Sequence, residues 1–254
     1  MVKPILRWPG GKSKHLKRLL PLISPHVCYV EPFAGGLALL LAKERSDVEI
    51  VNDSNRDLIA LYRCVQWHPE ALCAEIEWCL SARVNIADFR ENRGLTDLQR
   101  AARFLVLNKT SFAGSMTSFA VQKTSGGGAA FSRARLADLM KALNARLDKV
   151  VVECLDWMRC VDLYDSENTL FFLDPPYLGS TIRAYAGWTE EQMTALRDVL
   201  RRLKGRWILT VDASKFCHSL FSEWNCRTVE TPNKAVNLRT HGHVTMRELI
   251  ITPA

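Results

Sequence analysis

The sequence predicts an α/β protein built on a mostly parallel sheet. Short apolar segments alternate with helical patterns in the first and last parts of the 254-residue chain. Strands that alternate with helices pair in parallel, because each connection crosses the sheet in the same right-handed sense. A central stretch carries helical patterns only. We therefore expect a sheet domain that is interrupted by a mainly helical insertion.

The first part of the sheet domain is expected to hold two strands and two helices. Residues 27–31 form a short apolar run that ends before Pro32, and residues 48–52 form a second such run. Leu and Ala dominate residues 37–45, which predicts a helix between the two strands. A further helix is expected over about 55–66.

The second part of the sheet domain continues the same alternation. Apolar, β-branched and aromatic runs predict strands over residues 150–153, 170–173, 207–211 and 244–252. A helix over 190–203 separates two of these strands, as a parallel sheet requires.

The insertion is expected over residues 67–145, which leaves 1–66 and 146–254 as the sheet domain. It has helical patterns, no convincing strand, and a flexible loop signal at 125–130. Residues 81–150 hold 12 Lys and Arg against 5 Asp and Glu. An excess of positive charge of this kind favours a polyanionic partner, with a solubilising surface as the alternative.

The rest of the charge is unevenly distributed as well. The chain carries a net charge of +7, and residues 1–30 hold 6 Lys and Arg without any Asp or Glu. No apolar run approaches the roughly 18 residues that span a bilayer, and the first residues lack the apolar core of a signal peptide. The eight cysteines form no C-x-x-C pair, which argues against a zinc or redox site. We expect a cytoplasmic protein with reduced thiols, no membrane contact and no metal.

The tetrapeptide Asp174-Pro175-Pro176-Tyr177 directly follows the apolar run 170–173. Ligands of open α/β sheets bind at the carboxyl ends of the strands, where this aspartate lies. An acid, two rigid prolines and an aromatic ring can together clamp a flat group that bears an amine. Asp174 and the Pro175 carbonyl would accept hydrogen bonds from the amine, and Tyr177 would stack on the ring. The alternative is a plain exit from the strand.

A second candidate site begins where the first predicted strand ends. Gly35 and Gly36 follow Glu31-Pro32-Phe33, and glycines there let a ligand approach the backbone closely. Asp53 comes 17 residues after Gly36, at the end of the next strand, and an acid at about this distance commonly binds a ribose diol. No G-x-G-x-x-G is present, so a nucleoside without phosphates fits better than a dinucleotide. A structural turn is the alternative.

Two polar segments have weaker signals. Residues 8–13, Trp-Pro-Gly-Gly-Lys-Ser, are not a P-loop, because Leu6 occupies the position of its first glycine. They predict either a lid, in which Trp8 covers a ligand and Lys12 faces a carboxylate, or a glycine turn that caps a helix. Residues 108–114 begin with Asn-Lys-Thr-Ser-Phe, which suits phosphate contact and base stacking, or a loop packed by Phe112.

These motifs, in this order, resemble the Dam-type DNA adenine-N6 methyltransferases in which the cofactor motif precedes the catalytic one. The resemblance runs from Trp8 to Glu248-Leu-Ile-Ile251 and so covers nearly the whole chain. It implies a Rossmann-like methyltransferase sheet with an antiparallel last strand, and a target-recognition domain in the insertion. It also implies S-adenosylmethionine as cofactor, double-stranded DNA as partner and a monomer, with a dimer on DNA as the alternative.

The resemblance implies a role for each site residue. The base that receives the methyl group would be gripped by Asp174, Pro175, Pro176 and Tyr177. The cofactor would be bound by Trp8, Lys12, Phe33, Gly35, Gly36, Asp53, Asp156 and Trp157. DNA would be contacted by Asn108, Lys109, Thr110, Ser111 and Phe112.

One segment departs from the family pattern. Members that recognise GATC have an arginine after the Asn-Arg pair, whereas this chain has Ala113-Gly-Ser-Met-Thr117, and Lys109 replaces the usual arginine. We therefore expect that GATC is not the preferred site. Cytosine N4, RNA, or DNA binding without catalysis stay open as alternatives at this point.

Overall fold

The computed structural model describes residues 1–79, 83–117, 119, 133–178, 188–232 and 245–253. Contacts within the chain divide it into two compact units. The first, which we call the helical unit, comprises Met1–Leu20, Gly35–Glu44 and Asp53–Cys154. The second, the sheet unit, comprises Pro21–Ala34, Arg45–Asn52 and Leu155–Ala254.

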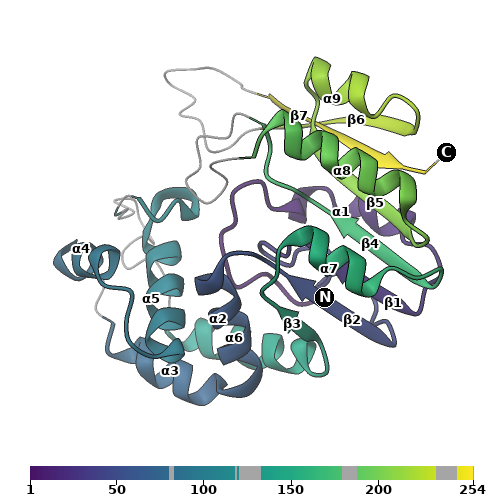
Figure 1. Cartoon of the computed structure of the whole chain (residues 1–254). Coiled ribbons are helices and arrows are strands. Elements are labelled where there is room, and N and C mark those ends of the chain that lie inside the picture. The colour runs from purple at the N-terminus through teal and green to yellow at the C-terminus, as the bar shows by residue number, and fades with distance from the viewer. Residues whose placement is uncertain (80–82, 118, 120–132, 179–187, 233–244, 254) are drawn as a thin grey trace. The chain divides into compact units, whose positions relative to one another are not determined.

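The sheet has seven strands in the order β3-β2-β1-β4-β5-β7-β6 (Figure 1). Parallel pairing joins β1 to β2 and β4, and β4 to β5, while β7 is antiparallel to β5 and β6. The bounds of the strands are β1 Cys28–Glu31, β2 Val48–Asn52, β3 Val151–Glu153, β4 Thr169–Leu173, β5 Arg206–Asp212, β6 Asn225–Pro232 and β7 Thr245–Thr252. The predicted mostly parallel sheet with an antiparallel last strand is confirmed.

The four parallel strands β1, β2, β4 and β5 end at one edge of the sheet. Their last residues are Glu31, Asn52, Leu173 and Asp212, respectively. All five residues of β4 are buried, because this central strand has neighbours on both sides. The chain segments that follow these strands therefore all start at this edge of the sheet, and the one after β4 starts from a fully buried strand.

Helices α7 (Trp157–Tyr164) and α8 (Glu190–Arg202) pack on the core of the sheet unit. In α8 the buried residues Met193, Leu196, Val199 and Leu200 recur at the three- and four-residue spacing of one helix face. Thr189 begins the helix with a capping box, in which its hydroxyl accepts from Gln192 N. The predicted helix over 190–203 is confirmed.

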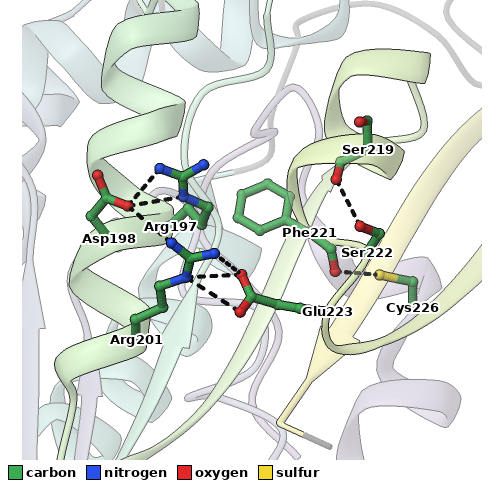
Figure 2. Close-up of polar contacts among 8 residues, drawn as sticks. All are labelled: Arg197, Asp198, Arg201, Ser219, Phe221, Ser222, Glu223 and Cys226. Atoms are coloured by element: carbon green, nitrogen blue, oxygen red, sulfur yellow. Dashed lines mark hydrogen bonds and ion pairs between the residues drawn. The ribbon is translucent and has the colours of Figure 1, made fainter.

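The end of α8 is tied to the segment that follows α9 (Lys215–Leu220). Figure 2 shows the Arg201 guanidinium between Asp198 of its own helix and Glu223, whose Oε1 lies 2.8 Å from Arg201 Nη2. The hydroxyl of Ser222 donates to the Ser219 carbonyl at 2.9 Å. These exposed contacts brace the entry into β6.

Strand β6 was not expected from the sequence. Its residues, Asn-Cys-Arg-Thr-Val-Glu-Thr-Pro, are largely polar and show no apolar run. It pairs with β7 over eight residues, from Asn225 to Pro232. An edge strand with one neighbour can be polar because much of its surface faces water.

The helix predicted over 37–45 is wrong. The chain there forms successive turns, with hydrogen bonds from Leu41 N to Leu37 O and from Ala42 N to Leu39 O. Leu37 has φ 57°, in the left-handed region that a right-handed helix excludes. Good helix formers therefore did not suffice here, because the preceding glycine turn sets a different backbone direction.

The helical unit is built around α2 (Arg56–Trp67) and α5 (Asp97–Thr110), which pack together. Asn55 caps α2 by accepting from Asp57 N and Leu58 N, and Thr96 caps α5 in a capping box with Gln99. The remaining longer helices of this unit are α3 (Pro69–Glu77), α4 (Arg83–Glu91) and α6 (Arg133–Leu147). Across 67–145 the described residues form helices and no strand, as predicted.

The beginning of the chain forms short helical turns. They comprise a 3₁₀ turn at Lys12–Lys14, α1 at Leu16–Leu19 and a second 3₁₀ turn at Leu20–Leu22. A third 3₁₀ turn, Phe112–Gly114, follows Ser111 after α5 and has φ 50° at Ala113. No helix among the described residues is long and apolar enough to cross a membrane. All eight cysteines are unpaired thiols.

Candidate active site

Asp174 leaves the carboxyl end of β4 and is held by the neighbouring strand. The hydroxyl of Thr210, on β5, donates to Asp174 Oδ1 at 2.8 Å. Pro175 and Pro176 have no N–H to donate, and residues 174–177 form neither helix nor strand. A carboxylate on a rigid exit from a buried strand is thus fixed at the sheet edge, as the sequence predicted.

Tyr177 lies among three acids. Burial raises the pKa of its hydroxyl well above the ordinary value, and the nearby charges of Asp174, Glu248 and Asp212 raise it further. Glu248 is buried on β7 and pairs across the sheet with Asp212, the last residue of β5. The Tyr177 hydroxyl therefore stays protonated at physiological pH.

In the helical unit, Trp8 lies on the glycine turn. A Cβ added to Gly35 would lie 2.7 Å from Trp8 Nε1, and one added to Gly36 would lie 2.9 Å from Trp8 Cβ. Gly35 also has φ 45°, a conformation that L side chains rarely adopt. Both glycines are needed for the indole to come this close, so the motifs at 8–12 and 31–36, remote in sequence, meet here.

Asp53 anchors the same turn. Its Oδ2 accepts from Gly35 N at 3.1 Å, and its Oδ1 accepts from Asn55 N at 2.9 Å. Burial raises the pKa of Asp53, and these two hydrogen bonds oppose that effect. Each carboxylate oxygen has a second lone pair, so the group can also accept from the two hydroxyls of a ribose.

Lys12 is buried, and its amino group donates to the Gly10 carbonyl at 2.8 Å. Gly10 has φ 73°, and Gly11 N donates to Trp8 O at 3.0 Å, which closes a turn. Residues 8–11 thus form a glycine turn, as expected if this segment is a turn that caps a helix. Trp8 lies over the backbone of Gly35 and Gly36, and the interpretation of the segment as a lid over a ligand stays a prediction.

In the sheet unit, Phe33 and Trp157 form an aromatic cluster with Trp188. The ring centroids lie 5.8 Å apart for Phe33 and Trp157, 5.5 Å for Phe33 and Trp188, and 6.1 Å for Trp157 and Trp188. Sequence reasoning missed Trp188. The sequence could have indicated Trp188 only by its position, directly before the N-cap of α8 and a short way along the chain after residues 174–177. Its indole N–H is buried without a hydrogen-bond acceptor among the described residues.

Asn52 organises the loops around this cluster. Its amide donates to Pro32 O at 2.9 Å and to Leu155 O at 3.2 Å, and its Oδ1 accepts from Leu155 N at 2.7 Å. The exits of β1 and β2 and the start of the 155–157 segment are therefore joined by one buried side chain. Asp156, which follows, caps α7 by accepting from Met158 N at 2.9 Å.

The residues predicted to contact DNA differ in exposure. Asn108, Thr110 and Ser111 are at most 1% exposed, and each side chain bonds to backbone of the helical unit. Phe112 is 58% exposed. Burial and the neighbouring charge of Arg7 lower the pKa of Lys109 to about 8. Phe112 is thus exposed and Lys109 is half-buried, whereas the side chains of the other three bond within the helical unit.

Asn108 holds two segments that are about 100 residues apart. Its Oδ1 accepts from Arg7 N at 2.9 Å, and its Nδ2 donates to Arg7 O at 3.0 Å and to Gly114 O at 3.3 Å. A Cβ on Gly114 would lie 1.9 Å from Arg7 O, so only glycine fits there. This arrangement, which we call the Asn108 clamp, ties the residue before Trp8 to the loop after α5. No sequence pattern signals the part that Arg7 plays.

The helical unit brings together Trp8, Gly35, Gly36 and Asp53, while the sheet unit brings together Phe33 and Trp157, and it places Asp174 at its edge. Among the described residues, no group of three or more His, Cys, Asp or Glu side chains could hold a metal ion.

Similarity to known proteins was found along most of the chain. A sequence model of the family described as "D12 class N6 adenine-specific DNA methyltransferase" matches residues 8–234. Type II methyltransferase M.CviBI from Paramecium bursaria Chlorella virus NC1A is 25% identical, over 87% of this chain and 86% of that protein. Type II methyltransferase M1.LlaDCHI from Lactococcus lactis subsp. cremoris is 24% identical, over 99% and 95%. The Retron Ec67 DNA adenine methylase of Escherichia coli is 32% identical over a shorter match, 43% of this chain and 41% of that protein.

Proposed function

The chain belongs to the D12 class of N6 adenine-specific DNA methyltransferases, and we propose that it transfers a methyl group from S-adenosylmethionine to a flipped-out adenine in duplex DNA. The observation that carries this proposal is the Asp174-Pro-Pro-Tyr177 segment at the carboxyl end of β4, with Asp174 held by Thr210. No metal and no covalent enzyme intermediate are needed, because the methyl group of the cofactor is already activated on a sulfonium.

For the cofactor, we propose roles for the residues of each unit. Asp53 accepts hydrogen bonds from the ribose hydroxyls, and Trp8, Gly35 and Gly36 contact the methionine part, together with Lys12. The support is the close approach of Trp8 to the glycine turn and the carboxylate of Asp53 on that same turn. A glycine backbone lets a ligand come closer than any side chain would allow.

The remaining cofactor contacts are proposed for the sheet unit. Asp156 accepts from the amino group of the cofactor's adenine, Trp157 packs against that ring, and Phe33 flanks the methionine part. The support is the aromatic cluster, in which the half-buried Phe33 lies 5.8 Å from the largely buried Trp157, and the exposed carboxylate of Asp156.

At the target base, the amine of adenine is a poor nucleophile because its lone pair is delocalised into the ring. We propose that Asp174 and the Pro175 carbonyl accept its two hydrogens, which favours a more pyramidal nitrogen. Attack then depends on positioning and electrostatics, and Asp174 is the acceptor for the proton that the nitrogen loses. Tyr177 would stack on the base, and stacking returns roughly 1–3 kcal/mol of the few kcal/mol that flipping costs.

For the DNA, we propose that residues 67–145 form the target-recognition domain. Lys109 binds phosphate and Phe112 meets a base or sugar, while Asn108, Thr110 and Ser111 hold their loop. The segment Phe112–Thr117 has no arginine to read guanine, which supports a site other than GATC. We propose a monomer that acts in a bacterial or phage-infected cytoplasm.

Expression in a host without DNA methylation, followed by methylation-sensitive sequencing, tests the activity, the base and the site together. We expect N6-methyladenine at one short sequence, and Asp174→Ala should abolish it while calorimetry still detects S-adenosylmethionine binding. Asp198→Ala, an exposed aspartate on α8, is the matched control and should keep full activity. Complete protection of GATC would refute the predicted specificity, and N4-methylcytosine by nucleoside mass spectrometry would refute the predicted base.

A further inference from the structure

Thr210 is the residue of β5 that meets the catalytic tetrapeptide. It is fully buried, in the strand sequence Arg-Trp-Ile-Leu-Thr-Val-Asp. Strands β4 and β5 are parallel, with Leu173 opposite Leu209, so the next residues of the two chains, Asp174 and Thr210, lie side by side. The strand register therefore places one hydroxyl beside the carboxylate.

The single proton of this hydroxyl has two possible acceptors. Asp174 Oδ1 lies 2.8 Å from Thr210 Oγ1, and the Leu173 carbonyl lies 3.5 Å away. A hydroxyl prefers a charged acceptor at short distance, and 3.5 Å exceeds the usual length of an O–H···O bond. The proton therefore goes to Asp174, and it fixes which carboxylate oxygen faces β5.

We propose that Thr210 is a positioning residue for Asp174, and that it sets how strongly the enzyme prefers a target base that bears an exocyclic amine. With Oδ1 bound to β5, the plane of the carboxylate is fixed and Oδ2 is held in one direction. An amine then meets an acceptor that is already oriented. This inference rests on the proposed role of Asp174.

Three variants separate positioning from mere packing. Thr210→Val keeps the shape of the side chain and removes the hydroxyl, while Thr210→Ser keeps the hydroxyl. The matched control is Thr169→Val on β4, because Thr169 is 1% exposed and its hydroxyl donates to Tyr164 O, not to Asp174. If Thr210→Val does not fold, Thr210→Cys replaces it, since a thiol is similar in size and a weak donor.

The first readout is binding selectivity. Duplexes that carry the methylation site with either adenine or purine at the target position are titrated in the presence of S-adenosylhomocysteine, and the ratio of the two dissociation constants is measured. Purine lacks the 6-amino group, and its different pairing with thymine affects every variant equally, so that difference cancels between variants. The second readout is the single-turnover rate of methylation at saturating DNA and cofactor.

We expect Thr210→Val to lower the purine-to-adenine ratio of the dissociation constants, and the single-turnover rate, by roughly ten-fold or more, the effect of one hydrogen bond to a charged group. Thr210→Ser and Thr169→Val should stay within about two-fold of the unsubstituted enzyme. A Thr210→Val enzyme that is folded and unchanged in both readouts would overturn the inference. If Asp174→Ala also leaves the ratio unchanged, the proposed role of Asp174 fails instead, so the two failures are distinguishable.

Discussion

Removal of the Asn108 side chain should test whether the clamp positions Trp8 for the cofactor. Asn108→Ala removes three hydrogen bonds, one from Arg7 N and two to the carbonyls of Arg7 and Gly114. The Asn108 side chain is fully buried, while its two bonds with Arg7 are partly buried. Arg7 directly precedes Trp8, and a loosened Arg7 backbone should therefore loosen the indole on the glycine turn.

The size of the effect follows from these bonds. A hydrogen bond of this kind contributes about 1 kcal/mol, so three predict a loss of about 3 kcal/mol in the free energy of unfolding. For a chain of this length, that corresponds to a fall in Tm on the order of 6–12 °C. A second substitution, Asn108→Asp, keeps the acceptor for Arg7 N but places a carboxylate against two carbonyls, and it should cost at least as much.

The assay pairs thermal unfolding with calorimetric titration of S-adenosylhomocysteine. The matched control is Asn144→Ala, because Asn144 is also in the helical unit and donates to the carbonyls of Val65 and Gln66 at 2.9 Å. Both variants should lower Tm, but only Asn108→Ala should also weaken cofactor binding, by several-fold below Tm.

Two results would refute this reasoning. A fall in Tm of less than about 2 °C in Asn108→Ala would mean that the clamp contributes little to stability. An equal change in cofactor affinity for Asn108→Ala and Asn144→Ala would mean that the clamp does not position Trp8.

Three further predictions concern the other site residues. The pKa of Lys109 is about 8, so its side chain loses its charge, and DNA affinity should fall, as the pH rises through about 8. Lys109→Arg should remove this fall in affinity. A fluorescence anisotropy titration that shows the same pH profile for both proteins would contradict the prediction. Burial raises the pKa of Asp53, so on acidification the cofactor affinity should be lost at a pH above 3.8, the ordinary pKa of aspartate. Calorimetry measures this affinity, and Asp53→Asn should bind the cofactor weakly at every pH. Gly35→Ala should weaken cofactor binding at least ten-fold, since the added Cβ meets Trp8. The control is Gly10→Ala, because Gly10 also has positive φ but an added Cβ there has no atom within 4 Å. Equal losses of affinity in the two variants would show that backbone strain alone is responsible.

The strands of the parallel sheet could be predicted because burial on both faces leaves a direct mark on the sequence. β2 and the runs in β4 and β5 are apolar segments bounded by turns, and their carboxyl ends carry Asn52-Asp53 and Asp174. The catalytic candidate could thus be placed at the sheet edge from these patterns. β6 could not be predicted, since a polar edge strand shows no apolar pattern.

The failure at 37–45 has a different cause. Helix propensity is a local average of a few tenths of a kcal/mol per residue, and contacts made elsewhere in the chain override it. The glycine turn beneath Trp8 fixes the backbone at Gly35, and Leu37 then adopts positive φ. Trp8, which is remote in sequence, therefore takes part in deciding the conformation of this segment.

Residue types and local patterns identify the candidate groups for the chemistry: the acid after β4, the acid after β2 and the glycines between Phe33 and Leu37. They suffice there because ligands of α/β sheets bind where the strands end. Only the tertiary structure, by contrast, shows which polar side chains form hydrogen bonds that hold other segments of the protein in place. Asn108 is a clamp within the helical unit, and Thr210, one hydroxyl in an apolar strand, holds Asp174. These roles join residues that are far apart along the chain, and packing brings them within hydrogen-bond distance, which no local pattern records.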